Sequence, residues 1–385
     1  MDKMSLADKH FEDLIDELIK KNGQEVLPLS DKNLIVVHHL LPTHLPLFKY
    51  LAKVFNKVVL IAIPYSLDFN ARELLAVESI TIESPRTLPD LINTLRRWLV
   101  DWGLTSAKRF LVFEVGGYSC EILVEHADLL RDKIEGVVED TEQGLRLHER
   151  CLENGNMWWQ VFSVARSPLK VAEDALTGDA VIFSLERQIR LLHDTLNLKN
   201  VLVMGFGKIG KHLSLSLKRR KTKVLVYDID PYKLLEAYSS GFEIRPRKKM
   251  LKSAEIIIGA TGSTSIKSGD FELLKDSVFL VSASSKTIEF DLNYLENNAI
   301  EINKVNESVD QYVLSSGKRI YLMNGGAPIN FIDLGIIGFP LELVWIECLF
   351  CLLEVFKQER FGIFELQEEK RRTIAERWIE VVLTS

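Results

Sequence analysis

The sequence predicts an α/β protein with two domains, each built on a parallel sheet that helices cover on both faces. Three observations support this class. Apolar strand-like runs alternate with helical stretches along most of the 385 residues, as in sheets whose parallel strands are connected by helices. A glycine turn of the kind that holds a nucleotide pyrophosphate follows one run, at residues 205–210. The length also fits two domains of roughly 100–200 residues each.

The composition excludes several classes of protein. A hydrophobic share of 47% and a charged share of 26% are those of an ordinary globular chain. The net charge of −6 gives no reason to expect nucleic acid or a membrane surface as a partner. The N-terminus is acidic and amphipathic, unlike a signal peptide, and the apolar run 341–356 is interrupted by glutamates and too short for a bilayer. We therefore expect a cytoplasmic protein.

The cysteines predict reduced thiols rather than a metal site. Cys348 and Cys351 form a CxxC motif, but they lie inside an apolar run of helical length. No second CxxC or pair of histidines completes a zinc-type ligand set. Packing in the core is the expected role of this pair, and no metal is expected.

The first domain is expected over residues 1–178, completed by 332–385. It begins with an amphipathic helix and ends with an apolar and a charged helix, at 5–22, 341–356 and 364–383. Between them, strand-like runs occupy 33–39, 57–63 and 108–117. Ligands of such sheets bind at the carboxyl ends of the strands.

The second domain is expected over residues 179–331. A long helix at about 179–196 leads into it, followed by strand-like runs at 200–204, 223–228, 255–259, 277–283 and 319–323. These runs again alternate with helical stretches, which predicts a Rossmann-type sheet inserted between the two parts of the first domain.

The turn after the run at 200–204 predicts an NAD site. Gly205, Gly207 and Gly210 form GxGxxG, where the glycines permit a tight turn, approach to the pyrophosphate and close helix packing. Asp228 ends the next strand, where a carboxylate accepts the ribose hydroxyls and repels a 2′-phosphate, so NAD is favoured over NADP. The predicted cofactor contacts are Gly205, Phe206, Gly207, Lys208, Ile209, Gly210, Asp228, Ile229, Thr261, Gly262, Ser263 and Ser284.

With these elements placed, the chain resembles the S-adenosylhomocysteine hydrolase family, most specifically over residues 195–331. The matching text includes GFGKIGK, DIDPYKLLEAYSSGFEI, ATGSTSI and NGGAPIN. The resemblance implies that this segment is an NAD domain in which Asn330 contacts the nicotinamide carboxamide. It also implies a homo-oligomer, with a dimer favoured. The family's C-terminal tail, which caps NAD in a neighbouring subunit, has no counterpart in this sequence, and this argues against such mutual capping.

The N-terminal half resembles the family more faintly, yet in the same order. HHLLPTHLPLFKYL is similar to its histidine-bearing segment and implies a catalytic or substrate-contact role for His39. VFEVGG resembles its aspartate-rich strand end, which implies that Glu114 or Val115 replaces an aspartate. GVVEDTEQGL resembles its glutamate–threonine segment and implies Asp140 as the catalytic carboxylate with Thr141 beside it.

The resemblance also implies departures from the family's acid–base set. The family's catalytic lysine falls on Arg166, which cannot act as a base at ordinary pH. The partner aspartate, four residues on, falls on Lys170. Two family histidines fall on Ser285 and Phe339. Ordinary adenosylhomocysteine hydrolysis is therefore not expected, although the cofactor residues are nearly complete.

Several of these residues keep two interpretations. His39 lies near His38 and His44 and serves either substrate contact or packing, because no further ligand completes a metal site. Asp140 is either a pocket carboxylate or a helix N-cap. Lys170 is either a base for hydroxyl oxidation, with its pKa lowered by burial, or a surface lysine. Arg166 would suit an anionic group on a substrate.

Together these features predict an NAD-dependent oxidoreductase acting on a hydroxyl of a small polar substrate. The substrate is expected to be nucleoside- or sugar-like and to carry an anionic group. Its catalytic residues would be Lys170, Asp140 and His39, with Arg166, Thr141 and Glu114 binding substrate. One alternative is a catalytically inert NAD-binding sensor or regulatory protein. Another is a true adenosylhomocysteine hydrolase with a rearranged base set.

Overall fold

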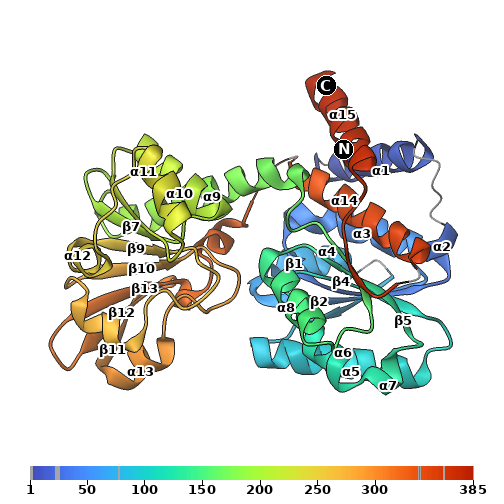
Figure 1. Cartoon of the computed structure of the whole chain (residues 1–385), viewed down its shortest axis with the longest axis horizontal. Helices are drawn as coiled ribbons and strands as arrows, with labels where there is room; N and C mark the ends of the chain where they lie inside the picture. The colour runs from blue at the N-terminus through green and yellow to red at the C-terminus, as the bar shows by residue number, and fades with distance from the viewer. Residues whose placement is uncertain are drawn as a thin grey trace. The chain divides into compact units, whose positions relative to one another are not determined.

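A computed structural model describes residues 3–21, 27–76, 79–336, 338, 340–358 and 360–384. The chain divides into two compact units (Figure 1). Unit 1 comprises residues 1–172 and 337–385, and unit 2 comprises residues 173–336. These limits lie a few residues from those expected from the sequence, and each unit is an α/β structure with its own sheet.

Unit 1 is built on a parallel sheet with the strand order β14-β6-β5-β4-β1-β2-β3. The strands are β1 (Asn33–Leu40), β2 (Lys57–Leu67), β3 (Ile80–Glu83), β4 (Phe110–Glu114), β5 (Ile134–Glu139), β6 (Gln160–Ser163) and β14 (Gly362–Phe364). The chain runs from β1 outward to β3 and then crosses to β4 on the other side of β1. The order of strands therefore reverses between β1 and β4, which is where ligands bind in sheets of this kind.

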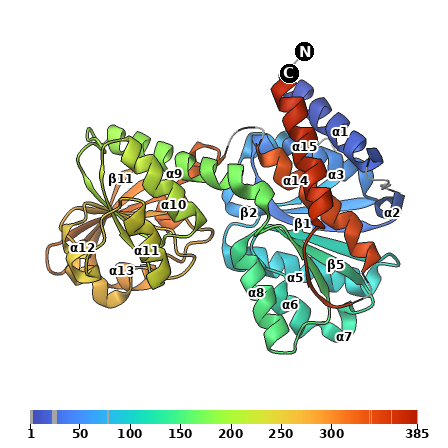
Figure 2. The same ribbon diagram turned by 45° about the horizontal axis from the view of Figure 1, so that its top comes forward.

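Helices cover both faces of this sheet. They are α1 (Lys3–Lys21), α2 (Leu27–Ser30), α3 (Leu45–Val54), α4 (Phe69–Leu75), α5 (Leu88–Thr105), α6 (Cys120–Glu125), α7 (Ala127–Leu130), α8 (Glu142–Glu153), α14 (Pro340–Glu354) and α15 (Glu368–Thr384). Figures 1 and 2 show α1, α3, α14 and α15 on one face and α5, α6 and α7 on the other. Because both faces are covered, the central strands are continuous apolar runs, and β4 is buried along its whole length.

The ends of the elements in unit 1 follow local chemistry. Thr87 and Asp90 form a capping box at the start of α5. β4 ends at Glu114, earlier than the predicted 117, because Gly116 and Gly117 turn the backbone to positive φ. The short strand β14 was not predicted, since its three residues lie between charged segments and carry no periodic signal.

The apolar helix α14 is buried on all sides, as the sequence predicts, yet its glutamates are buried too. Glu347 pairs with Arg371 of α15, and Glu354 pairs with Lys357 and Lys370. Burial raises the pKa of Glu342 from 4.5 to about 7. Glu342 and Glu354 therefore differ although they lie on one helix. Burial disfavours the anionic form of Glu342, whereas the ammonium groups of two lysines stabilise the anionic form of Glu354.

We expect Glu342→Gln to remove a pH dependence of stability. Because the folded-state pKa of Glu342 is raised, its stabilising contribution is complete below pH 4.5 and is lost as the pH rises towards 7. The difference corresponds to at most ~3 kcal/mol. The free energy of unfolding, measured in urea between pH 4.5 and 8, should fall less with rising pH in the variant.

Glu354→Gln is the matched control on the same helix. Burial acts on Glu354 in the opposite direction, but Lys357 and Lys370 lower its pKa overall. Its contribution is therefore present above its unfolded pKa and is lost on acidification. A Glu354→Gln variant that loses no stability at neutral pH, or a Glu342→Gln variant with an unchanged pH slope, would contradict this account.

Unit 2 is built on a sheet with the order β11-β12-β13-β10-β9-β7-β8. The strands are β7 (Asn200–Met204), β8 (Lys223–Tyr227), β9 (Ile256–Gly259), β10 (Val278–Ser282), β11 (Ala299–Asn306), β12 (Val309–Leu314) and β13 (Arg319–Met323). Five neighbouring strands run parallel, in the order β8, β7, β9, β10 and β13, and β12 and β11 extend the sheet as an antiparallel hairpin. The strand order reverses at β7, between β8 and β9, so a ligand is expected at the carboxyl end of β7.

The helices of unit 2 are α9 (Val171–Leu191), which starts two residues before the unit, α10 (Lys208–Arg219), α11 (Pro231–Ser239), α12 (Arg247–Ser253) and α13 (Leu292–Asn298). The prediction of a helix over 179–196 was wrong at both ends. The helical segment starts earlier because Ser167 caps a short 3₁₀ helix, Pro168–Lys170, that leads directly into α9. It ends earlier because the chain takes positive φ at His193. None of the helices in the described part of the chain combines the length and apolarity needed to cross a bilayer.

Candidate functional site

The glycine turn of unit 2 lies at the carboxyl end of β7 and leads into α10. A Cβ atom on Gly205 would lie 2.6 Å from the carbonyl oxygen of Ala260, and one on Gly210 would overlap the carbonyl of Gly205. Gly207 differs, because a Cβ there would meet nothing within 4 Å. Gly207 is also the N-cap of α10 and provides no side-chain cap. The first N–H groups of this 12-residue helix therefore begin beside open space, as a pyrophosphate requires.

Asp228 lies at the carboxyl end of β8, beside the turn. Its two carboxylate oxygens accept N–H bonds from Phe206 at 2.6 Å and from Asp230 at 2.9 Å. These bonds fix the carboxylate at the edge of the turn and leave lone pairs for the hydroxyls of a ribose. Ile229, beside it, is 90% exposed and offers an apolar surface.

The structure corrects the predicted contact of Phe206. Its side chain is fully buried and packs edge-on against Phe242, with ring centroids 5.7 Å apart. Its N–H group is taken by Asp228. Phe206 thus stabilises the turn by packing its side chain into the core. Of the following residues, Lys208 lies 3.5 Å from Asp174, and Ile209 packs against the core of the unit.

The predicted contacts after β9 and β10 are held together by Glu289, which is not among the residues predicted from the sequence. Glu289 is fully buried and accepts N–H bonds from Thr261 at 2.7 Å and Gly262 at 2.8 Å. It also accepts the hydroxyl of Ser284, which in turn accepts the N–H of Gly262 at 3.0 Å. The available signal was a glutamate placed directly between two large apolar residues, Ile288 and Phe290. Ser263 is exposed, and its N–H group is bonded to the hydroxyl of Thr261.

Asn330 completes the same edge of the sheet. It is 5% exposed and lies on the 3₁₀ helix Ile329–Asp333, next to Pro328, which bridges to Ser282 at the end of β10. The residues predicted to bind NAD therefore gather along the carboxyl ends of β7, β8, β9 and β10. These residues fit a dinucleotide. The open space at Gly207 leaves room for a pyrophosphate close to the backbone, and a side chain at this position would occupy that room.

In unit 1, Lys170 and Asp140 form a buried ion pair. Lys170 is 8% exposed, and its Nζ lies 2.6 Å from Asp140 Oδ1 and 3.3 Å from the carbonyl oxygen of Asp140. The interpretation of Lys170 as a surface lysine is therefore wrong. Asp140 is not a helix N-cap either, because Thr141 caps α8 by accepting the N–H of Gly144.

The three histidines at the end of β1 pack against one another. Burial lowers the pKa of His38 to about 4 and lowers those of His39 and His44 as well, so the imidazoles are neutral at pH 7. His39 is half-buried, and its Nδ1 lies 2.5 Å from the hydroxyl of Ser66. His38 and His44 are buried against Phe48. Packing thus accounts for His38 and His44. His39, at the end of β1, remains a candidate for substrate contact.

The structure corrects the anion-binding role predicted for Arg166. Its guanidinium already forms ion pairs with two carboxylates of α8, Glu142 at 2.8 Å and Glu149 at 2.7 Å. These two charges more than neutralise it, and they raise its pKa further. An anionic substrate group would have to compete with both glutamates.

Glu114 and Thr141 are also committed to internal bonds. Glu114 is fully buried and accepts the N–H and the hydroxyl of Ser119 at 2.9 and 2.5 Å, so its predicted contact with substrate is corrected. Thr141 donates its hydroxyl to Glu139 at 2.6 Å and caps α8 with the same oxygen. Both residues shape the loops at the strand ends. Phe339, at a family histidine position, lies outside the described residues.

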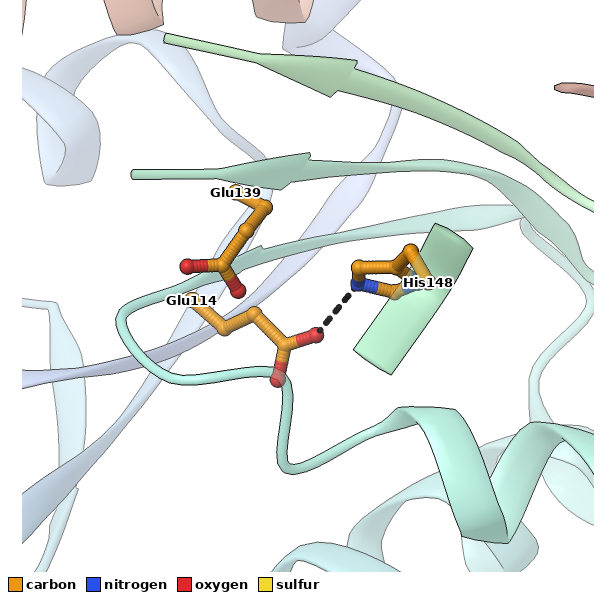
Figure 3. Close-up of side chains that lie close together, drawn as sticks. All are labelled: Glu114, Glu139 and His148. Carbon is orange, nitrogen blue, oxygen red and sulfur yellow. Dashed lines mark ion pairs between the residues drawn. The ribbon is translucent and has the colours of Figure 1, made fainter. Parts of the chain in front are cut away.

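Glu114 belongs to a buried cluster with Glu139 and His148, whose side chains point toward one another (Figure 3). Their polar atoms lie within 4.8 Å of one another, close enough to hold a metal. The donor set argues against one. The indole of Trp159 can only donate, and it bonds His148 Nδ1 at 3.2 Å, so neutral His148 carries its proton on Nε2, facing Glu114 at 3.3 Å.

One carboxyl group of the cluster has a raised pKa. Burial and the negative charge of Glu114 raise the pKa of Glu139 to about 7. Glu139 also accepts the N–H groups of Gly116, Gly117 and Thr141, at 3.1, 2.8 and 2.6 Å. It fixes the glycine loop after β4, next to the point where the strand order reverses, and the start of the segment that carries Asp140.

Comparison with known proteins links the two units to one group of enzymes. Residues 179–335 match the family described as S-adenosyl-L-homocysteine hydrolase, NAD binding domain. The chain is 28% identical over 326 residues to the adenosylhomocysteinase of Thermotoga maritima, covering 84% of this chain and 76% of that protein. It is 28% identical over 263 residues to the S-inosyl-L-homocysteine hydrolase of Methanopyrus kandleri, covering 65% of this chain and 60% of that protein.

A third relative is 31% identical over 224 residues, the adenosylhomocysteinase of Pyrococcus abyssi, covering 57% of this chain and 51% of that protein. The chain thus spans between half and three quarters of the length of these relatives. Among solved structures, a dipicolinate synthase protein from Bacillus halodurans has a TM-score of 0.50 at 14% identity, over 87% of this chain and all of that chain. This likeness shows the fold alone.

Proposed function

We propose that this chain is an NAD-dependent enzyme of the S-adenosylhomocysteine hydrolase family, and that it oxidises a hydroxyl of a small polar, nucleoside- or sugar-like substrate. Unit 2 would hold the cofactor, and Lys170 with Asp140 in unit 1 would move the proton. When bound, NAD supplies a hydride acceptor, so the protein itself needs to provide only cofactor positioning and proton transfer.

The observation that carries this proposal is the open space at Gly207. The turn is closed tightly at Gly205 and Gly210, whereas a Cβ on Gly207, at the start of α10, would meet no neighbour. A turn that served packing alone would have no need of a glycine there. Asp228, held beside the turn by two N–H bonds, favours NAD over a cofactor with a 2′-phosphate.

The proton-transfer role rests on the Lys170–Asp140 pair. Asp140 orients Nζ through a 2.6 Å bond, and both groups are nearly shielded from water. When Lys170 is neutral, its Nζ can accept the proton of a substrate hydroxyl, and Asp140 stabilises the ammonium that results. The inert-sensor alternative gives no reason to bury this ion pair.

One observation favours adenosylhomocysteine-type hydrolysis as a second candidate function. The resemblance involves a lysine followed four residues later by an aspartate, which the sequence analysis set on Arg166 and Lys170. Lys170 and Asp174 have the same spacing of four residues and are a lysine and an aspartate. Lys170 is also buried, whereas Arg166 is exposed. Release of a free thiol from S-adenosylhomocysteine or S-inosylhomocysteine tests this candidate directly.

We expect Gly207→Ala to weaken NAD binding at least about tenfold without unfolding the protein, since a methyl group there removes backbone approach to the pyrophosphate. Two measurements check this: NAD and NADH released on denaturing the purified protein, and titration of the nucleotide-free protein with NAD. The melting temperature without nucleotide should stay unchanged.

Gly269→Ala is the matched control. Gly269 lies in the same unit, a Cβ there also meets nothing within 4 Å, and its backbone does not need positive φ. It should bind NAD as the wild type does. A wild-type protein that contains no dinucleotide and binds none when titrated would overturn the proposal, as would equal binding by the Gly207→Ala variant.

A further inference from the structure

The CxxC motif of the chain is chemically protected. Cys348 and Cys351 lie on α14, and both are completely buried. Burial raises the pKa of both thiols well above the ordinary value of 9.0. Neither sulfur forms the thiolate that reacts with oxidants, so the pair that the sequence marks is inert.

The other two cysteines, 31 positions apart in the sequence, meet in space. Cys120 is the first residue of α6, and Cys151 lies near the end of α8. Cys120 Sγ lies 3.2 Å from Nδ1 of His148 on α8, and Cys151 follows His148 by three positions, so both project from the face of α8 that meets Cys120. Cys151 is half-buried and reachable from solvent, whereas Cys120 is 2% exposed. The geometry is that of one accessible thiol with a second thiol directly behind it.

The contact between the two thiols also divides their reactivity. The neighbouring Cys120 thiol lowers the pKa of Cys151 to about 7, against the effects of burial and of Glu121. The same contact and burial raise the pKa of Cys120. His148 Nδ1, 3.2 Å from Cys120 Sγ, also accepts the indole N–H of Trp159 and so fixes the position of Cys120 behind Cys151.

We propose that Cys120 and Cys151 are a reactive dithiol that a hydroperoxide converts reversibly into a disulfide joining α6 to α8. The Cys151 thiolate attacks one peroxide oxygen and breaks the O–O bond, and the leaving hydroxide takes a proton to become water. Cys151 is then a sulfenic acid. The Cys120 sulfur attacks it and breaks the S–O bond, and the proton of Cys120 leaves with the hydroxyl as a second water. Two thiols and one hydrogen peroxide thus give one disulfide and two waters.

The test is treatment of the purified full chain with a small excess of hydrogen peroxide at pH 7, followed by intact mass and non-reducing peptide mapping. We expect loss of two hydrogens, a Cys120–Cys151 cross-linked peptide and full reversal by dithiothreitol. At limiting iodoacetamide, Cys151 should be alkylated before the other cysteines by at least about tenfold.

Two single variants keep the proposal open to refutation. Cys151→Ser should form no disulfide, and Cys120→Ser should accumulate a sulfenic acid on Cys151 that dimedone labels. Cys348→Ser, in the buried motif, should behave as the wild type. A disulfide that includes Cys348 or Cys351, modification of Cys120 before Cys151, or an unmodified protein at peroxide levels that oxidise a free thiol peptide would each overturn it.

Discussion

Lys170→Met is expected to lower turnover by about 10²–10⁴-fold, the usual range for losing a positioned acid–base group, while bound NAD stays unchanged. Methionine keeps the length and apolar stem of the lysine but cannot hold a proton. Lys170 is 8% exposed and its Nζ bonds Asp140 Oδ1 at 2.6 Å, whereas the cofactor residues lie in the other unit. The variant therefore separates proton transfer from cofactor binding.

Turnover should be followed as NADH formed in a single turnover and as thiol released, with the substrate that gives the highest wild-type rate. Lys32→Met is the matched control. Lys32 lies in the same unit and forms a comparable partly buried ion pair with Glu135 at 3.0 Å, but Glu135 is near the start of β5 and Asp140 follows its end. Lys32→Met should keep full activity and content of NAD.

The possible results distinguish the functions. Turnover that survives in Lys170→Met would show that Lys170 is not the base. A wild type that holds NAD but turns over no nucleoside, sugar or hydroxy acid would support the inert sensor. Thiol release by the wild type, lost in the variant, would support the hydrolase and the pairing of Lys170 with Asp174 along the chain.

The sequence predicts the parts of the fold that local patterns determine. β7 and β13 begin and end where their apolar runs do, and the glycine turn lies between strand and helix as expected. The hairpin of β11 and β12 was missed because β11 is an edge strand exposed along most of its length, so it lacks the alternation that marks a strand. The early start of α9 was missed because Ser167 and Pro168 set it from outside the apolar pattern.

The errors at the site have a different cause. A sequence shows which residues carry charge but not which distant residues neutralise them. Arg166 looked available until Glu142 and Glu149 of α8 were found on its guanidinium. For Lys170 the sequence left a base and a surface lysine as alternatives, and only its burial against Asp140 excludes the second. Glu289 was not predicted as a site residue, because its role is to accept N–H bonds from a loop 28 residues earlier in the chain.

Arg371→Leu is the stability change with the largest expected effect. Glu347 of α14 is fully buried, and its Oε1 accepts a 2.6 Å bond from Arg371 Nε. Removing the guanidinium leaves a buried carboxylate without its cation, which costs about 3–5 kcal/mol. The free energy of unfolding at pH 7, from urea titration, should fall by this amount. Arg377→Leu, on the same helix but pairing with Glu17 and Glu380 in solvent, should change it little.

The double variant Glu347→Leu/Arg371→Leu separates the cost of a bare charge from the loss of packing. With both partners apolar, most of the lost stability should return, because a buried ion pair contributes little net stability over hydrophobic side chains of similar volume. Burial already raises the pKa of Glu347, and losing Arg371 raises it further. A carboxyl with a raised folded-state pKa stabilises at low pH and loses that contribution as the pH rises. The Arg371→Leu defect should therefore be smaller at pH 5 than at pH 8, whereas an equal loss at both pH values would mean that Arg371 acts through packing and not through charge.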